Sequence, residues 1–311
     1  MPFFKLSGRL FMSDLKKVKP FVKWAGGKTQ ILSEIRKLYP DELGKSMNKY
    51  AEPFVGGGAV LFDILSNYDM EEIYISDINR SLINTYLTIR DNVDSLISLL
   101  GIYERDFIAK DIEERKEYFI NNRKRFNEIK RINDNKDMIE SSALFIFLNK
   151  TCFNGLYRVN KKGEFNVPMG SYKNPCICDI DNLFLISDLL RNVNIVCADY
   201  KQSVNFIDKN TFVYIDPPYR PLNETSGFNS YNEVIFDDNE QILLAKYVDK
   251  LSNIGAKVLA SNSDPKNVDI EDNFFDDLYK KHKISRINAK RMINSKGNLR
   301  GNINELLICN F

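Results

Sequence analysis

The sequence predicts an α/β fold built on a doubly wound, mainly parallel sheet whose last strand is antiparallel. Short apolar runs alternate with amphipathic helical runs in residues 18–80 and again in 191–311, which is the pattern of strand–helix–strand units. Several of the apolar runs end in an acid or in glycines, as in sheets that bind a nucleotide at the carboxyl ends of their strands. From 81 to 190 the alternation lapses and helical patterns dominate, so we expect a mainly helical insert there.

The composition is that of a globular protein. The 311 residues, 43% hydrophobic and 28% charged, suffice for one large domain or for a domain with a substantial insert. Because the net charge is only +2, a surface for a polyanion would have to come from local clusters of cations. The odd number of cysteines, five, argues against a disulfide framework, and no apolar run approaches the ~18 residues of a membrane span. We therefore expect a cytoplasmic protein with no membrane contact.

Glycine, proline or polar residues bound the apolar runs, so the period of each run assigns it to a strand or a helix. We expect strands at 50–54, 72–77, 194–199, 211–216, 257–262, 281–287 and 305–309, the last two forming a closing hairpin. Helical periodicity predicts helices at 30–38, 59–65, 82–100, 113–131, 239–251 and 269–278.

The first glycine motif of the chain is ambiguous. Gly27-Lys28-Thr29 copies the tail of a phosphate-binding loop, but that loop needs a glycine five residues before Gly27, where the chain has Val22. A nucleoside-triphosphatase is therefore a weak alternative. The other interpretation is a tight turn that lets Trp24 and the neighbouring lysines face a ligand.

A second glycine motif follows the strand at 50–54. Gly56-Gly57-Gly58 precedes a helix, as in sheets that cradle nucleotides, although its consecutive glycines do not match the G-x-G-x-x-G fingerprint. Taken alone, it could be a purely structural turn. Asp77 ends the next strand about 20 residues later, which is the spacing of an acid that binds a ribose. Together the two features favour an adenosine-type ligand.

Asp216-Pro217-Pro218-Tyr219 ends the apolar strand at 211–216. Each proline fixes its own φ and removes an N–H group, so a stiff loop rich in acceptors results, with an aromatic ring at its end. Such a loop suits an exocyclic amino group beside a stacked base. The acids Asp77, Asp199 and Asp216 could instead bind magnesium in a phosphate-handling enzyme, but no phosphate-binding loop accompanies them and the Pro-Pro-Tyr tail offers a metal nothing.

An aromatic amine is a poor nucleophile because its lone pair is delocalised into the ring. If Asp216 and the Pro217 carbonyl accepted its two hydrogens, they would favour a pyramidal nitrogen with an available lone pair, while Tyr219 stacked on the base. The electrophile would be a methyl sulfonium held over the glycines, attacked in line, with no metal and no covalent enzyme intermediate. A base within a duplex would have to be flipped out to reach this loop.

Two basic segments predict a nucleic-acid surface. The stretch 149–174 reads as a β-hairpin that turns at Lys161-Lys162-Gly163 and mixes cations with aromatic residues. An exposed hairpin without a partner is the alternative. A second run contains eight cations and no acid: Lys280, Lys281, Lys283, Arg286, Lys290, Arg291, Lys296 and Arg300. It also holds the single histidine of the chain, His282, which we expect at the surface. A chain with one histidine argues against a histidine-based hydrolase.

These motifs, in this order, resemble the Dam-type (alpha group) DNA adenine-N6 methyltransferases from about Pro20 to the end of the chain. The resemblance implies a Rossmann-like methyltransferase sheet formed by 18–80 and 191–311, with 81–190 as the DNA target-recognition insert. It implies catalysis by Asp216, Pro217, Pro218 and Tyr219. It implies binding of S-adenosylmethionine by Trp24, Lys28, Phe54, Gly56, Gly58, Asp77 and Asp199.

The resemblance also implies that duplex DNA is the partner and that the target sequence is GATC. The residues expected to contact DNA are Lys23, Phe153, Asn154, Leu156, Arg158, Pro168, Tyr172 and Arg291. Arg158 would contact a guanine, in agreement with the general pairing of Arg with guanine. We expect a monomer that could serve beside a restriction endonuclease. Two alternatives stay open: a DNA-binding protein that has lost catalysis, and an amino methyltransferase acting on RNA or protein.

Overall fold

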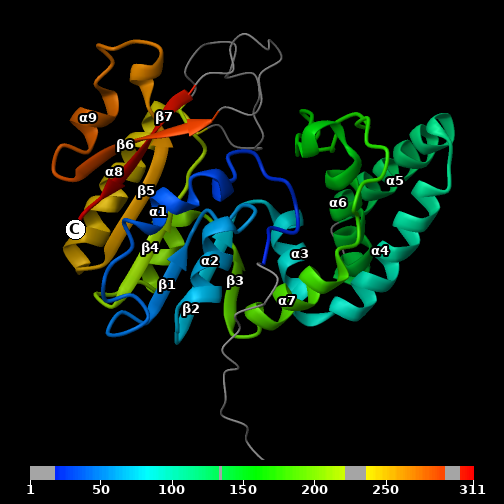
Figure 1. Ribbon diagram of the computed structural model, residues 1–311, viewed down its shortest axis with the longest axis horizontal. Helices are drawn as coiled ribbons and strands as arrows, with labels where there is room; N and C mark the ends of the chain where they lie inside the picture. The colour runs from blue at the N-terminus through cyan, green and yellow to red at the C-terminus, as the bar shows by residue number, and fades with distance from the viewer. Residues whose placement is uncertain (1–17, 133–134, 221–235, 291–301) are drawn as a thin grey trace, which may run out of the picture.

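The computed structural model describes residues 18–132, 135–220, 236–290 and 302–311 (Figure 1). Within these residues the chain forms a seven-stranded sheet in the order β3-β2-β1-β4-β5-β7-β6. The strands are β1 (Lys49–Glu52), β2 (Glu72–Asp77), β3 (Val193–Cys197), β4 (Thr211–Ile215), β5 (Lys257–Ser263), β6 (Lys283–Lys290) and β7 (Asn302–Cys309). The first five are mutually parallel, whereas β7 runs antiparallel to both β5 and β6. The predicted fold class is confirmed, including the antiparallel last strand and the closing hairpin.

Strand β1 marks the point where the strand order reverses. It pairs with β2 on one side and with β4 on the other, so the chain leaves β1 in one direction and returns on its far side. In open α/β sheets a ligand-binding crevice lies at the carboxyl ends of the strands at such a point. The Gly56–Gly58 turn follows β1 and the Asp216–Tyr219 loop follows β4, so the topology brings the two motifs to one edge.

Alternate residues of each strand feed two separate apolar cores. In β4, Phe212 and Tyr214 pack with the helices α1 (Leu32–Arg36) and α2 (Ala59–Asn67), while Val213 and Ile215 pack against α8 (Asp238–Ile254). Because all of β4 is buried, the strand is apolar throughout instead of alternating with polar residues. The short helix α9 (Phe274–Leu278) completes the second core through Phe275.

The middle of the chain is helical, and Figure 1 shows most of it set beside the sheet. Its helices are α3 (Arg80–Asp91), α4 (Val93–Ile108), α5 (Ile112–Ile132), α6 (Met138–Thr151) and α7 (Ile180–Leu190). Helix α6 is buried on every side because α3, α4 and α5 all pack on it. Its core is continuous with the core that α2 and α3 form on the sheet.

Three predicted helices differ from the structure. The helix expected at 269–278 is only α9, because 269–273 form no helix. The helix expected at 82–100 is two helices, because Asn92 leaves the helical conformation (φ −142°) between α3 and α4. The helix expected at 30–38 is a 3₁₀ turn at Lys28–Gln30 followed by a single short α-helix, α1.

The expected β-hairpin in 149–174 is only partly regular. Isolated antiparallel bridges join Val159 to Phe165 and Cys152 to Met169, with no extended ladder between them. The turn lies where it was predicted, since Gly163 adopts a φ of +75° and donates its N–H to the Asn160 carbonyl at 2.8 Å.

In the described residues, no helix combines the length and the apolar character that a membrane crossing requires.

Candidate active site and nucleic-acid interface

The turn after β1 requires glycine for steric reasons. Gly56 and Gly58 have φ values of +48° and +74°, which side chains rarely adopt. A Cβ atom on Gly58 would lie 2.5 Å from the Tyr86 hydroxyl, and one on Gly56 would lie 2.8 Å from the Trp24 ring. The motif is therefore a closely packed backbone turn that leads directly into α2.

Two of the predicted acids end neighbouring strands. Asp77 accepts hydrogen bonds from the Gly56 N–H (3.2 Å) and the Asn79 N–H (2.9 Å), and burial raises the pKa of its carboxyl. Asp199 is exposed just beyond β3 and caps the 3₁₀ helix at Tyr200–Asn205. Since Asp77 pairs with Cys197 across β2 and β3, the two carboxylates lie at one edge of the sheet.

Asp216 has two partners at its Oδ1 atom. The Ser261 hydroxyl of β5 donates to it at 2.7 Å, and the Lys28 ammonium lies 2.7 Å away. Lys28 is 3% exposed and the Asp216 side chain is 20% exposed, so a buried ammonium pairs with a partly exposed carboxylate. The first glycine motif thus reaches the Asp216 carboxylate, a contact that the sequence did not predict for Lys28.

Tyr219 is held by a carboxylate of the last strand. Its hydroxyl donates to Glu305 Oε2 at 2.7 Å, and burial, together with the nearby Asp216 and Glu305, raises its pKa well above the usual value. The Lys28 ammonium lies 4.6 Å from the centroid of the Tyr219 ring. A nitrogen that carries hydrogens therefore already lies between the Asp216 carboxylate and the Tyr219 ring.

The carbonyl groups of Pro217 and Pro218 differ in their hydrogen-bond donors. The Gln241 side chain donates to the Pro218 carbonyl at 3.0 Å, and Asn262 in turn donates to Gln241. Among the described residues no donor contacts the Pro217 carbonyl. Within the described ranges, the Pro217 carbonyl is therefore an acceptor without a donor, at the position where the sequence analysis expects one.

Glu52, the last residue of β1, is a buried carboxyl close to this site. It is 2% exposed and accepts a hydrogen bond from the Tyr50 hydroxyl at 2.6 Å. Burial raises the pKa of Glu52 to about 8, with a further contribution from Asp216, so this carboxyl is largely protonated at neutral pH.

Seven of the eight residues expected to contact DNA are described. Arg158 and Pro168 are exposed, as are Phe153 and Asn154 in a turn where Asn154 adopts a φ of +55°. The Lys23 ammonium lies 3.2 Å from the Tyr172 hydroxyl, which brings two of these residues together from distant parts of the chain. Leu156 is half-buried, and Arg291 lies outside the described residues.

The run that begins at Lys280 is less cationic than its sequence suggests. Arg286 is paired with Asp264 and Asp276, and Lys281 with Asp249, so acids from other elements neutralise part of the charge. His282 was expected at the surface, but its side chain is 7% exposed and hydrogen-bonds to Asp249 at 2.8 Å. The part of the run in 291–301 lies outside the described residues.

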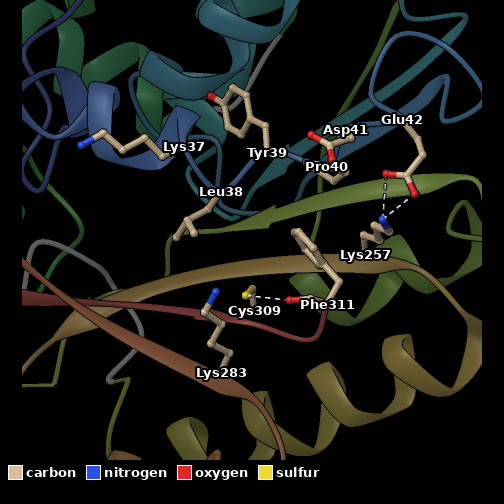
Figure 2. A pocket seen from close by; sticks show the side chains of 10 residues that line it. All are labelled: Lys37, Leu38, Tyr39, Pro40, Asp41, Glu42, Lys257, Lys283, Cys309 and Phe311. Carbon is tan, nitrogen blue, oxygen red and sulfur yellow. Dashed lines mark hydrogen bonds and ion pairs between the residues drawn. The ribbon is translucent and has the colours of Figure 1, made fainter.

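A shallow pocket lies at the opposite end of the sheet (Figure 2). Lys257, the first residue of β5, pairs there with Glu42, and Cys309 and Phe311 close the pocket from the end of the chain. This edge carries the amino ends of the parallel strands, whereas ligands of such sheets bind at the carboxyl ends. We therefore place the chemistry at the Gly56 and Asp216 edge.

Comparison with known proteins decides the family. The family model described as D12 class N6 adenine-specific DNA methyltransferase matches residues 24–293, most of the chain. The chain belongs to this family. The matched region contains both glycine motifs, the helical middle and the Asp216–Tyr219 loop.

Individual relatives agree over nearly their whole length. The Type II methyltransferase M.MjaIII of Methanocaldococcus jannaschii is 51% identical over 296 residues, which cover 94% of this chain and 99% of that protein. The Type II methyltransferase M1.LlaDCHI of Lactococcus lactis is 37% identical over 296 residues, covering 94% and 96%. A DNA adenine methylase of Haemophilus influenzae is 33% identical over 294 residues, covering 94% and 93%.

Family membership makes the chain an adenine-specific DNA methyltransferase and implies S-adenosylmethionine as the methyl donor. The Gly56 edge of this methyltransferase fits that molecule. Helix α2 begins without an acid in its first turn and without a side-chain cap at Gly58, although the Leu61 N–H in that turn interacts with the buried Glu52 carboxyl. Phe54 stacks on Tyr200 at 5.1 Å as an apolar wall beside Asp77 and Asp199. The buried Tyr200 hydroxyl has no partner among the described residues.

No group of His, Cys, Asp or Glu side chains with the arrangement of a metal site occurs in the described parts of the methyltransferase. Each of the three predicted acids instead has its own partners. Asp77 and Asp199 accept hydrogen bonds from backbone N–H groups. Asp216 contacts Lys28 and Ser261.

Three polar residues that hold the site were missed by the sequence analysis. Ser261 and Glu305 lie in apolar strands and contact Asp216 and Tyr219, respectively. Asn149, at the end of the apolar helix α6, hydrogen-bonds to both the N–H and the carbonyl of Lys23 at 2.8 Å. The available signal was a polar residue within a buried element, since such a residue requires a partner.

Proposed function

We propose that this methyltransferase transfers a methyl group from S-adenosylmethionine to the N6 amino group of an adenine flipped out of duplex DNA, in the sequence GATC. The observation that carries the proposal is the Lys28 ammonium, which lies 2.7 Å from Asp216 and 4.6 Å from the centre of the Tyr219 ring. An adenine stacked on Tyr219 would present its amino nitrogen to the same carboxylate.

The catalytic roles follow from the acceptors around that nitrogen. Asp216 and the Pro217 carbonyl accept the two amino hydrogens, so that the nitrogen lone pair turns toward the methyl group. Ser261 fixes the carboxylate of Asp216, and Glu305 fixes the ring of Tyr219 through its hydroxyl. Pro218 keeps the loop rigid, since Gln241 also holds its carbonyl.

When bound, S-adenosylmethionine supplies the methyl group as a sulfonium electrophile. We propose that Asp77 and Asp199 hydrogen-bond to its adenosine part and that the turn at Gly56 and Gly58 lets it lie close to the backbone. Phe54 supplies the apolar wall. Trp24 and Lys28 line the same crevice from the first glycine motif.

Recognition of DNA is assigned to 81–190, and catalysis to 18–80 and 191–311. The exposed Arg158 would read a guanine, and Leu156 and Pro168 would pack on base edges. Phe153 would fill the space left by the flipped adenine, because it is 53% exposed at a sharp turn. We propose that Lys23, Asn154, Tyr172 and Arg291 complete the contact.

The oligomeric state and the cellular setting belong to the same proposal. A monomer suffices, because all the residues in the proposed roles come from one chain. Pairing with a restriction endonuclease is supported by the two relatives that are called Type II methyltransferases.

The test is methyl transfer from labelled S-adenosylmethionine to two duplexes that differ only in whether they contain GATC. We expect incorporation into the GATC duplex alone, and its loss in Asp216→Ala with DNA binding retained. Equal incorporation into both duplexes would overturn the GATC assignment. Incorporation into neither, or transfer to RNA in preference to DNA, would overturn the function.

A further inference from the structure

One polar face of helix α5 lies along the segment that follows the turn at Gly163. Lys130 Nζ donates to the Gly163 carbonyl at 2.7 Å, and Arg123 Nη1 donates to the Val167 carbonyl at 3.3 Å. Figure 1 shows the segment running beside α5 after it leaves α6. The helix therefore contacts the backbone of the segment, and not only its side chains.

Asn127 makes the central contact of this face. Its amide donates to the Phe165 carbonyl at 3.1 Å, and its Oδ1 accepts the Phe165 N–H at 2.8 Å. A neighbouring β-strand would satisfy the N–H and the carbonyl of one residue in the same way. Asn127 thus takes the place of a strand at this edge of the segment.

The spacing of the three donor residues on α5 matches the spacing of the backbone groups that they contact in the segment. The contacted positions 163, 165 and 167 recur every second residue, as one edge of an extended strand does, and 123, 127 and 130 lie on one face of a helix. The helix positions span about 10 Å and the strand positions about 13 Å, a difference that side chains bridge.

The other edge of the segment pairs with the residues proposed to read DNA. Asn166 donates its N–H to the Arg158 carbonyl at 3.1 Å, and the Arg158 guanidinium donates to the Asn166 side chain at 2.8 Å. The side chains alternate accordingly, with Phe165 and Val167 buried and Pro168 exposed. A slip of one residue would turn Phe165 outward and Asn166 inward.

We infer that Asn127 is a specificity-determining positioning residue, which sets the register of 163–167 against α5 and thereby the position of Arg158 at the DNA. Among the described residues, both side-chain hydrogen bonds of Asn127 go to Phe165 and none goes to the Asp216–Tyr219 loop. The inference rests on the proposed role of Arg158 and Pro168 in recognition. It adds that the accuracy of recognition depends on a helix behind the recognition segment.

The test compares Asn127→Leu with Asn121→Leu, which makes the same change at an exposed position of the same helix. Each protein methylates a pool of random-sequence duplexes, and sequencing that detects N6-methyladenine gives the preferred site. In Asn127→Leu we expect the preference for the best site over single-base-pair variants to fall about tenfold, the range of one lost base contact. Asn121→Leu should keep the wild-type preference.

A second variant guards against misfolding. Asn127→Asp keeps the acceptor for the Phe165 N–H but sets a carboxylate oxygen against the Phe165 carbonyl, so we expect the preference to relax here too, with wild-type affinity for S-adenosylmethionine. Wild-type preference in both Asn127 variants would overturn the inference and leave the proposed function intact. If the wild-type protein methylates no duplex, the proposed function itself fails, so the two failures are distinguishable.

Discussion

The contacts of Lys28 differ more from the sequence-based expectation than those of any other residue discussed above. Its motif resembles a phosphate-binding loop, yet its ammonium is buried against Asp216 and over the ring of Tyr219. A carboxylate that is largely buried needs a compensating partner, because desolvation of an unpaired charge is costly. Lys28 fills that need in the structure, and in the proposed mechanism the incoming amino group would share or take over the contact.

Replacing Lys28 by Met should therefore act on the chemical step. We expect kcat to fall by roughly 10- to 100-fold, the range for one hydrogen bond to a charged group. Because Lys28 also lines the proposed cofactor crevice, we expect the Kd for S-adenosylmethionine to rise by a smaller factor. Steady-state kinetics and calorimetry separate the two quantities. A raised Kd at unchanged kcat would instead show that Lys28 serves mainly to bind the cofactor.

Glu305 illustrates how a residue of the last strand supports a distant ring. Glu305→Ala should lower methyl transfer roughly tenfold, because the Tyr219 hydroxyl loses its acceptor, and Glu305→Gln should restore most of the rate through its amide oxygen. Tyr219→Phe combined with Glu305→Ala should be no worse than the more damaging single change. Additive losses in this double-mutant cycle would contradict a shared role.

Glu52 makes the stability of the fold depend on pH. Its pKa rises from 4.5 to about 8 on folding, so the folded state keeps a proton that the unfolded state has lost within that window. The free energy of unfolding should then decrease as pH rises from about 5 to about 8, by at most about 1.4 kcal/mol per pH unit from this group. Urea unfolding of Glu52→Gln should show a shallower decrease than wild type. The exposed Glu71→Gln, made as a control, should not.

At the scale of elements, the turn between β1 and α2 depends on backbone conformations that only glycine adopts readily. Gly58→Ala should destabilise the protein by roughly 1–3 kcal/mol, because the new Cβ would need a left-handed backbone and would meet Tyr86. Gly101 lies in α4 with no atom within 4 Å of its ideal Cβ, so Gly101→Ala should stabilise by up to about 1 kcal/mol. Thermal and urea unfolding measure both changes. Equal effects would contradict a special role for the turn.

The hairpin region in 149–174, which contains the segment 163–167 proposed to position Arg158, was predicted only in part from the sequence. Its turn at Asn160–Gly163 was predictable, because a glycine with a positive φ closes it. The ladder expected on both sides of the turn is reduced to single bridges, and α5 supplies hydrogen bonds to the edge of the segment that faces away from Arg158. A helix that covers a strand edge also protects that edge from pairing with another chain.

At the scale of the whole molecule, the crevice beside β1 should couple ligand binding to stability. S-adenosylmethionine at 100 times its Kd should raise the free energy of unfolding by about 2.7 kcal/mol, because only the folded state binds it. Thermal unfolding with S-adenosylmethionine, and separately with ATP and magnesium, tests this. A shift with ATP and none with S-adenosylmethionine would contradict the placement of S-adenosylmethionine in this crevice.

The sequence by itself determined the fold class and the order of the motifs. Strand and helix periods are local properties, and so are the glycines of the turn after β1 and the prolines after β4. They could therefore be predicted without knowing which strands are neighbours. The helix boundaries could not be predicted from the period alone, as the break at Asn92 shows, because asparagine has a low helix propensity and leaves the helical conformation there.

Only the tertiary structure decided which side chains support the site. Lys28, Ser261 and Glu305 reach the Asp216–Tyr219 loop from a turn and two strands that are distant in sequence. Their contacts depend on the order β1-β4-β5-β7 of the sheet, which no local pattern encodes. Since desolvation determines which polar groups must pair, the partners of Asp216 and Tyr219 were settled only when the sheet buried them.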